Sequence, residues 1–159
     1  MTTDSLNASA DALETLTDQF IANNSTHKEM IETVIASLEQ NNSAMVQQNG
    51  AGYLWKFFYG SVEVFVQLTG ETDDDFLTVW SPIMKYPVKD ELALLRKLLQ
   101  KNCQDTFESH FGIMSETIVV LSQRTVADLS PGEISRSITL VATVADNNDD
   151  ILIEEFGVK

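Results

Sequence analysis

Few side chains in this sequence could catalyse a reaction. The chain has two histidines, His27 and His110, and a single cysteine, Cys103. Glu108 stands two residues before His110, and this spacing would place a carboxylate and an imidazole on one face of a strand, where they could act as an acid–base pair. No Gly-rich loop or third polar group converges on them in the sequence. We therefore expect a surface pair at Glu108 and His110, a buried or half-buried thiol at Cys103, and no enzyme activity.

Two acidic clusters could bind a cation. The first, residues 73–75, is a run of three aspartates in one turn, whereas catalytic metal sites draw ligands from several elements. The second, residues 146–150, begins like an EF-hand loop, but Ile151 stands where the loop needs glycine and Gly157 where it needs glutamate. One cysteine and two distant histidines are too few for a zinc site. We predict no metal site and no cofactor.

The strongest structural signal is a β-hairpin at residues 53–68 around a Gly60-Ser61 turn. Glycine can adopt the positive φ that such two-residue turns need. On one face, this turn would pair Tyr59 with Val62, Phe57 with Val64, Trp55 with Val66 and Tyr53 with Leu68. Because all eight side chains are aromatic or branched and apolar, we predict that this face packs in the core. We expect Trp80, on the next strand, to be a core residue too.

The other face of the same hairpin mixes apolar and charged residues. Its pairs would be Phe58 with Glu63, Lys56 with Phe65, and Leu54 with Gln67. Exposed aromatic side chains on such a surface favour contact with a partner over chemistry. We therefore predict a partner-binding surface at Leu54, Phe58 and Phe65. The alternative is that a helix covers these side chains and makes them part of the core.

Capping signals and apolar spacing predict four helices. A short amphipathic helix is expected at about residues 9–22, and a Thr-x-x-Glu capping box at Thr26 opens a second that ends near Gln40. A third would begin at Pro87, because proline is favoured at the first helical position. Its apolar stripe would be Val88, Leu92, Leu95, Leu98 and Leu99. The fourth begins with Ser130-Pro131-Gly132-Glu133, which combines a cap, an N1 proline and a capping-box glutamate.

The last helix, which should extend to about Phe156, carries two apolar lines. The first line is Ile134, Ile138, Val141, Ala145, Asn148 and Leu152, and the second is Leu140, Val144 and Ile151. One line would cover the sheet. The other would pack on the first helix or on a second subunit, and we predict a homodimer formed through this helix.

Strands fill the remaining segments. A short strand is expected around residues 44–48, another at 76–80 that ends or bends at Ser81-Pro82, and a second hairpin made of 106–114 and 117–124. Strands joined by short turns should be antiparallel, with helices packed on one face. We predict an α+β fold: an antiparallel five-stranded sheet in the order helix, three strands, helix, two strands, helix, plus an N-terminal helix.

Composition limits the partners. A chain of 159 residues suggests one domain, here residues 26–157, after a polar extension at 1–25 that is partly helical. The net charge of −14 argues against nucleic acid and anionic lipid, which an acidic surface repels, and would suit either plain solubility or a basic partner. The N-terminus has no signal-peptide pattern, no run of about 20 apolar residues exists, and a lone cysteine suits a reducing compartment, so we expect a cytoplasmic location.

Three segments resemble a known family. They are WKFFYGSVEVFVQLTGETDDDFLTVWSPIM, ELALLRKLLQKNC and SQRTVADLSPGEISRSITLVATVADNNDDILIEEFG. Together they are similar to the YbjN-like family, whose members resemble the class I type III secretion chaperones in fold, and the similarity covers roughly residues 26–157. The resemblance implies a helix–three strands–helix–two strands–helix domain, usually a homodimer, with no catalytic residues. Secretion chaperones of this shape are acidic dimers that hold unfolded segments of partner proteins.

These observations favour a non-catalytic protein-binding module, a dimeric chaperone-like or adaptor protein that holds a segment of a partner protein. Two alternatives stay open. One is a regulator that binds a small ligand between the sheet and the helices. The other is an enzyme that uses a carboxylate–histidine site at Glu108 and His110.

Overall fold

The computed structural model describes residues 26–39 and 41–159, so the helix expected at 9–22 lies outside the described residues. The helices are α2 (His27–Leu38), α3 (Glu91–Gln104) and α4 (Pro131–Phe156). The strands are β1 (Met45–Asn49), β2 (Gly52–Tyr59), β3 (Val62–Leu68), β4 (Phe76–Lys85), β5 (His110–Met114) and β6 (Thr117–Thr125). The fold is α+β, as predicted.

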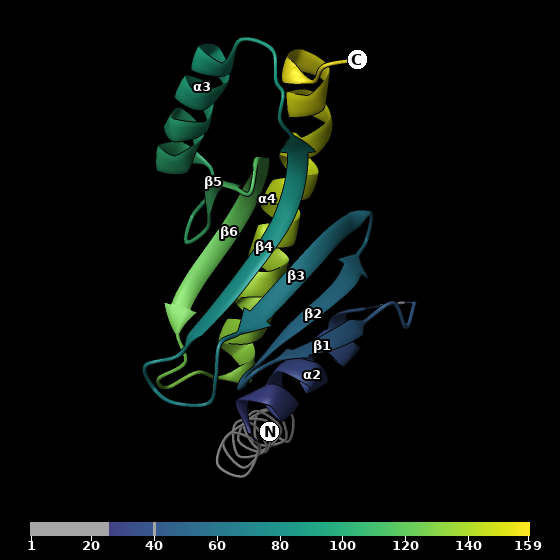
Figure 1. The fold of residues 1–159 in the computed structure, drawn as a ribbon, viewed down its shortest axis with the longest axis vertical. Coiled ribbons are helices and arrows are strands. Elements are labelled where there is room, and N and C mark those ends of the chain that lie inside the picture. The colour runs from purple at the N-terminus through teal and green to yellow at the C-terminus, as the bar shows by residue number, and fades with distance from the viewer. Residues whose placement is uncertain (1–25, 40) are drawn as a thin grey trace, which may run out of the picture.

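All strands form one antiparallel sheet in the order β1-β2-β3-β4-β6-β5, with α4 running along one face (Figure 1). The predicted count of five strands was wrong, because the sheet has six. The sixth strand is β1, which pairs with β2 across the Asn49–Gly52 connection. It matches the short strand expected around residues 44–48, which the predicted count left out, and all five of its residues are exposed.

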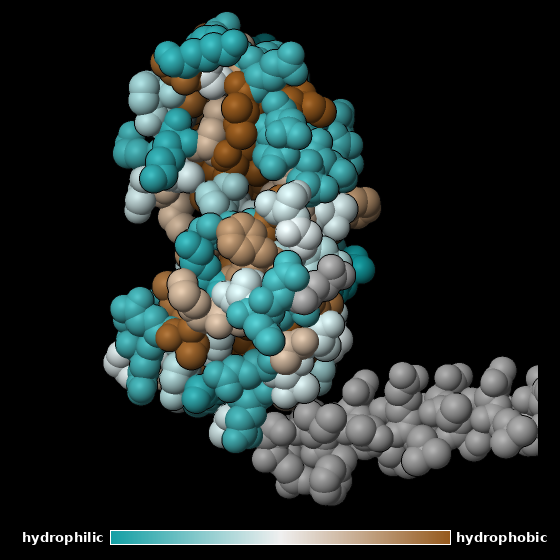
Figure 2. Space-filling view, turned by 90° about the vertical axis from the view of Figure 1, so that its right-hand side faces the viewer, coloured by the Kyte–Doolittle hydropathy of each residue, from teal (hydrophilic) through white to brown (hydrophobic). Residues whose placement is uncertain are grey.

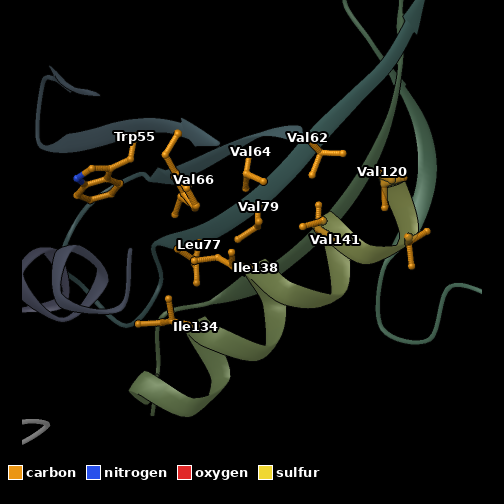
Figure 3. Packing of buried hydrophobic residues seen from close by; sticks show 14 of the residues in the cluster. Trp55, Val62, Val64, Val66, Leu77, Val79, Val120, Ile134, Ile138 and Val141 are labelled. Carbon is orange, nitrogen blue, oxygen red and sulfur yellow. The ribbon is translucent and has the colours of Figure 1, made fainter. Parts of the chain in front are cut away.

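The core lies between the sheet and the helices, and the predicted hairpin register is confirmed. Trp55 faces Val66, and Phe57 faces Val64. These four side chains are at most 2% exposed. Figure 3 shows valines of the sheet, among them Val64, pointing toward α4. The first apolar line of α4, Ile134, Ile138, Val141, Ala145, Asn148 and Leu152, is buried along its whole length, also as predicted.

Both predicted capping boxes are present. Thr26 accepts a hydrogen bond from the backbone N–H of Glu29, and Ser130 accepts one from that of Glu133. In each case the glutamate accepts a bond in return from the backbone N–H of the cap residue. The Glu71 carboxylate, from the β3–β4 loop, also accepts hydrogen bonds from two backbone N–H groups at the start of α2. Unpaired N–H groups at helix starts are thereby satisfied, which fixes where α2 and α4 begin.

Helix α3 begins four residues later than predicted. Its N-cap is Asp90, not a residue before Pro87, and the preceding segment pairs with the end of α4. Val88 forms a bridge with Gly157, and the Lys89 N–H donates to the Phe156 carbonyl. Because these backbone groups are used in long-range contacts, the segment does not join the helix, although its sequence has a helical pattern.

The second hairpin is shorter than predicted, since β5 begins at His110 rather than at Thr106. The preceding residues form a tight turn in which the Ser109 N–H and hydroxyl both donate to the Thr106 carbonyl. Phe107 adopts a positive φ of 52°, which no strand residue has. In β4, Ser81-Pro82 bends the strand without ending it: β4 continues to Lys85 past an irregularity between Pro82 and Met84.

The surface is largely polar on the side of the molecule drawn in Figure 2, where apolar residues gather in a narrow strip in the upper half. Among the described residues, no helix has both the length and the apolar composition that a membrane span requires.

Candidate protein-binding surfaces

The face of the hairpin that carries Phe58 has no helix over it in the described part of the chain. Helices α2, α3 and α4 contribute to a single core cluster on the opposite face of the sheet (Figure 1). Phe58 is 44% exposed, and Leu54 and Phe65 are half-buried. Within residues 26–39 and 41–159, therefore, no helix covers these three side chains, contrary to the alternative considered from the sequence.

The aromatic residues on this open face are held in place by their neighbours. The rings of Phe65 and Trp80 stack with centroids 5.2 Å apart and planes within 6° of parallel. The Lys56 ammonium lies 5.6 Å from the Phe65 ring centroid and 3.3 Å from a carboxylate oxygen of Glu63. Stacking and the charged neighbours restrict the rings, so the surface is preorganised for contact.

Trp80 was expected in the core, and the structure corrects this. It is half-buried on the open face, because β4 directs Leu77 and Val79 inward and its alternate residues outward. Its partner in the sheet is Phe65. The parity of β4 relative to Leu77 and Val79 was the signal in the sequence that could have placed Trp80 correctly.

Strand β1 extends this face to a free edge. Met45 pairs with Lys56, which places it on the open face, and it is 63% exposed. Val46 is 55% exposed and lies over a hollow of about 200 Å³ between α2 and β1, lined also by Ile35 and Trp55. The strand contains no charged residue and no proline, the residues that usually protect a sheet edge from pairing with another chain.

The acid–base pair proposed for Glu108 and His110 does not form. The Glu108 carboxylate accepts two hydrogen bonds from the Arg136 guanidinium, at 3.1 and 2.7 Å. These bonds hold the pKa of Glu108 below its usual value. His110 is exposed on β5, opposite Leu121. The arrangement is a surface ion pair between a turn and α4, and it lacks the converging groups of an acid–base site.

A hollow of about 260 Å³ beside this ion pair is lined by two arginines and two glutamates. Arg124 pairs with Glu133, and Arg136 pairs with Glu108. Burial acts to raise the pKa of Glu133, but hydrogen bonds from Arg124 and from Ser130 outweigh it and leave the pKa below its usual value. Because each arginine already has a carboxylate partner, neither is free to bind an anionic ligand.

The acidic clusters have structural roles. Asp75 accepts hydrogen bonds from the Thr72 hydroxyl and N–H and from the Thr69 hydroxyl, and the bond from the Thr72 hydroxyl is the largest reason that its pKa is lowered. Asp146 accepts a hydrogen bond from Ser61 at the hairpin turn. Within the described ranges, no three His, Cys, Asp or Glu side chains gather in a way that could hold a metal ion.

Helix α3 carries a second apolar surface, on its outer side. Leu92 is 77% exposed and Leu99 is 67% exposed, with Leu95 between them. Cys103 continues this stripe and is exposed, which corrects the expectation of a buried or half-buried thiol. The predicted apolar stripe of this helix was only partly right: Leu98 is buried as expected, but Leu92 and Leu99 are exposed, and Leu94, which the stripe left out, is buried.

Comparison with solved structures identifies a similar fold. The chain resembles one in the crystal structure of the ExsC-ExsE complex, with a TM-score of 0.51 and 15% sequence identity. The similarity covers 80% of this chain and 97% of that one. No curated protein matches the sequence.

A family model gives the more specific result. The model is YbjN, described as "Putative bacterial sensory transduction regulator", and it matches residues 27–154, from the start of α2 almost to the end of α4. This range contains the whole sheet and all the helices described above, apart from the last turn of α4. The chain therefore belongs to the YbjN family.

Proposed function

We propose that this protein is a non-catalytic, chaperone-like or adaptor module that holds a segment of a partner protein on the open face of the β2–β3 hairpin. The observation that carries the proposal is the position of Phe58, which is exposed, and of Leu54 and Phe65, which are half-buried, on a sheet face without a helix over it in the described residues. Apolar aromatic surfaces rimmed by charged groups, such as Lys56 and Glu63, are typical of protein contacts.

The neighbouring edge strand suggests how a partner segment would lie. The outer N–H and C=O groups of β1 can pair with an extended chain, and this mode of recognition takes its affinity from main-chain hydrogen bonds. Alternate side chains of that chain would then contact Met45 on the open face and Val46 over the hollow beside Trp55. The net charge of −14 favours basic or flexible segments over acidic ones.

The similarity in fold also supports a protein partner, since the matching chain was solved within the ExsC-ExsE complex. The same proposal places the protein in the cytoplasm, where a single exposed cysteine stays reduced, and gives it no nucleic-acid partner.

The proposal includes a homodimer, and the structure favours α3 over α4 as its contact. The first apolar line of α4 is buried against the sheet, and Val144 of the second line is buried as well. Leu92 and Leu99, by contrast, are exposed on α3, with Arg96 beside them. A two-fold axis beside α3 would bury this stripe against its copy, as isologous interfaces do. Native mass spectrometry of the wild-type chain and of Leu92→Gln/Leu99→Gln tests the interface: we expect a dimer and a monomer, respectively.

Binding through the hairpin face is tested by comparative capture from native lysate. Three baits are matched in expression and folding: the wild-type chain, Phe58→Ser/Phe65→Ser, and Ile113→Ser, which removes an apolar side chain that is 52% exposed on β5. We expect a protein that the wild type and Ile113→Ser retain and that the hairpin variant loses. If all three baits retain the same proteins, the hairpin face is not the binding surface.

A further inference from the structure

One aromatic side chain is held in solvent far from the hairpin face. Phe107 is 79% exposed and has a φ of 52°, a conformation that bulky side chains rarely adopt. Its loop is fixed on both sides, because Thr106 is fully buried and Ser109 is 3% exposed. Both hydroxyls donate to backbone carbonyls, Thr106 to Asn102 and Ser109 to Thr106. The loop therefore holds Phe107 at an exposed position, although neither packing nor backbone preference favours it.

Phe107 borders a groove of about 350 Å³ between the end of α3 and α4. Along α4 the groove follows Leu140, Val144 and Ile151, of which Val144 is buried and Ile151 is 56% exposed. These residues follow helical spacing over roughly 16 Å, about three turns of helix. An exposed aromatic ring beside an apolar strip of this length is suited to the apolar face of a docked helix.

The charges beside the groove are unbalanced. Asp150 and Glu154 are exposed, and their spacing places them on the flank of α4 next to Asn147, which lines the groove. Neither has an ion-pair partner among the described residues. Lys101 and Asp105 line the groove and pair with each other, and Lys97 pairs with Glu155, the residue after Glu154. The groove thus has an apolar line along α4, and the two acids beside it lack an ion-pair partner among the described residues.

We propose that this groove binds a basic amphipathic helix of a partner protein, whose apolar face packs on Phe107 and Ile151 and whose lysine or arginine side chains pair with Asp150 and Glu154. Charge selects this occupant. A second copy of the chain has a net charge of −14, and the segment 1–25 has four acidic residues and no lysine or arginine. Both would place acids against acids, which is unfavourable.

This site is separate from the hairpin face. The groove is on the side of the sheet that α3 and α4 cover, whereas Phe58 and Phe65 lie on the other side. Either surface can therefore fail its test without affecting the other. A partner that carries both an extended segment and a basic helix would contact both, with a gain in affinity from linking the two contacts.

The test uses the full chain and a fluorescein-labelled helical peptide of leucine and lysine with one apolar face. A second peptide with glutamate in place of every lysine is the control. Binding is measured by fluorescence anisotropy at physiological salt. Phe107→Asn removes the ring while keeping the fold, because asparagine tolerates positive φ better than phenylalanine. Asp150→Asn/Glu154→Gln removes the charges, and Asp73→Asn/Asp74→Asn changes the net charge equally in the β3–β4 loop, at the end of the molecule opposite α3 (Figure 1).

We expect saturable binding of the lysine peptide to the wild type and to Asp73→Asn/Asp74→Asn. Phe107→Asn and Asp150→Asn/Glu154→Gln should each weaken it at least about tenfold, a change of about 1.4 kcal/mol. The glutamate peptide should not bind. No saturable binding to the wild type, equal losses in both charge variants, or unchanged binding in Phe107→Asn would each overturn the proposal. Loss of binding in Leu92→Gln/Leu99→Gln alone would move the site to α3 and also refute it.

Discussion

The two faces of the β2–β3 hairpin are built from the same two strands but have opposite surroundings. One face places Phe57 and Val64 in the core cluster between the sheet and the helices, where both are fully buried. The other face carries Phe58, which is 44% exposed, and Phe65, which stacks on Trp80. Alternation along a strand places successive side chains on opposite faces of the sheet, but it does not require the face away from the core to be polar. Aromatic residues on the second face are not required by the core, so another contact has to explain them.

The largest expected effect is on the buried face. Phe57→Ala should lower the free energy of unfolding by about 3–5 kcal/mol, because it removes a fully buried ring and leaves a cavity in the core. Urea denaturation of the wild type and the variant measures the difference. A loss below about 1 kcal/mol would mean that the hairpin face and α4 are not packed as described.

On the open face the same kind of change should cost little. Phe58→Ser should lower the free energy of unfolding by about 1 kcal/mol or less, since nearly half of the ring is already in solvent. The same urea experiment applies, with Phe57→Ala as the reference. If Phe58→Ser were as destabilising as Phe57→Ala, the open face would be buried in solution, for instance by residues outside the described ranges.

A variant at the N-cap of α4 tests separately whether the stability of the buried face affects binding by the open face. Ser130→Ala removes the acceptor of the Glu133 N–H and should cost about 1 kcal/mol. Because α4 covers only the buried face, thermal unfolding should shift to lower temperature while partner capture by the hairpin face stays as in the wild type. Loss of capture at a temperature where the variant is folded would show that the two faces are coupled.

The smallest expected effect is on the free energy of unfolding at acid pH. The pKa values of Asp75 and Glu133 are lowered in the folded protein, so both carboxylates stabilise it above their usual pKa values of 3.8 and 4.5. This contribution is lost as the pH falls through the lowered values. Asp75→Asn should therefore flatten the loss of stability below the usual pKa of Asp75, in urea titrations at a series of acid pH values. An unchanged slope would mean that the bonds from Thr72 and Thr69 do not persist in solution.

Sequence patterns predicted those elements for which local preference and packing agree. The hairpin register followed from a glycine turn and an apolar face, and the start of α4 followed from its capping box. In α3 the two failed to agree: Leu92, Leu95 and Leu99 form a helical stripe as regular as Leu94 and Leu98, and only packing against distant parts of the chain decides which side is buried. Long-range contacts such as Val88 with Gly157 also lie beyond local patterns.

The residues of the candidate surfaces were likewise predicted correctly where local pairing fixes their position and wrongly where it does not. Phe58 and Phe65 were predicted to lie on the hairpin's second face because pairing across a two-residue turn fixes parity. Trp80 was misplaced because its large apolar side chain favoured a core position, although it alternates with the buried Leu77 and Val79 along β4. Phe107 was expected on a strand, and only the hydrogen bonds of the turn at Thr106 and Ser109 place its ring in solvent.

Photocrosslinking at position 58 tests most directly whether the open face contacts a partner protein. A photoreactive phenylalanine analogue replaces Phe58 in one sample and Ile113, which is 52% exposed on β5, in another. We expect a discrete protein adduct to form in cells from position 58 and to be absent from position 113. Adducts from position 113 alone, or the same adducts from both positions, would contradict a specific partner contact on the open face.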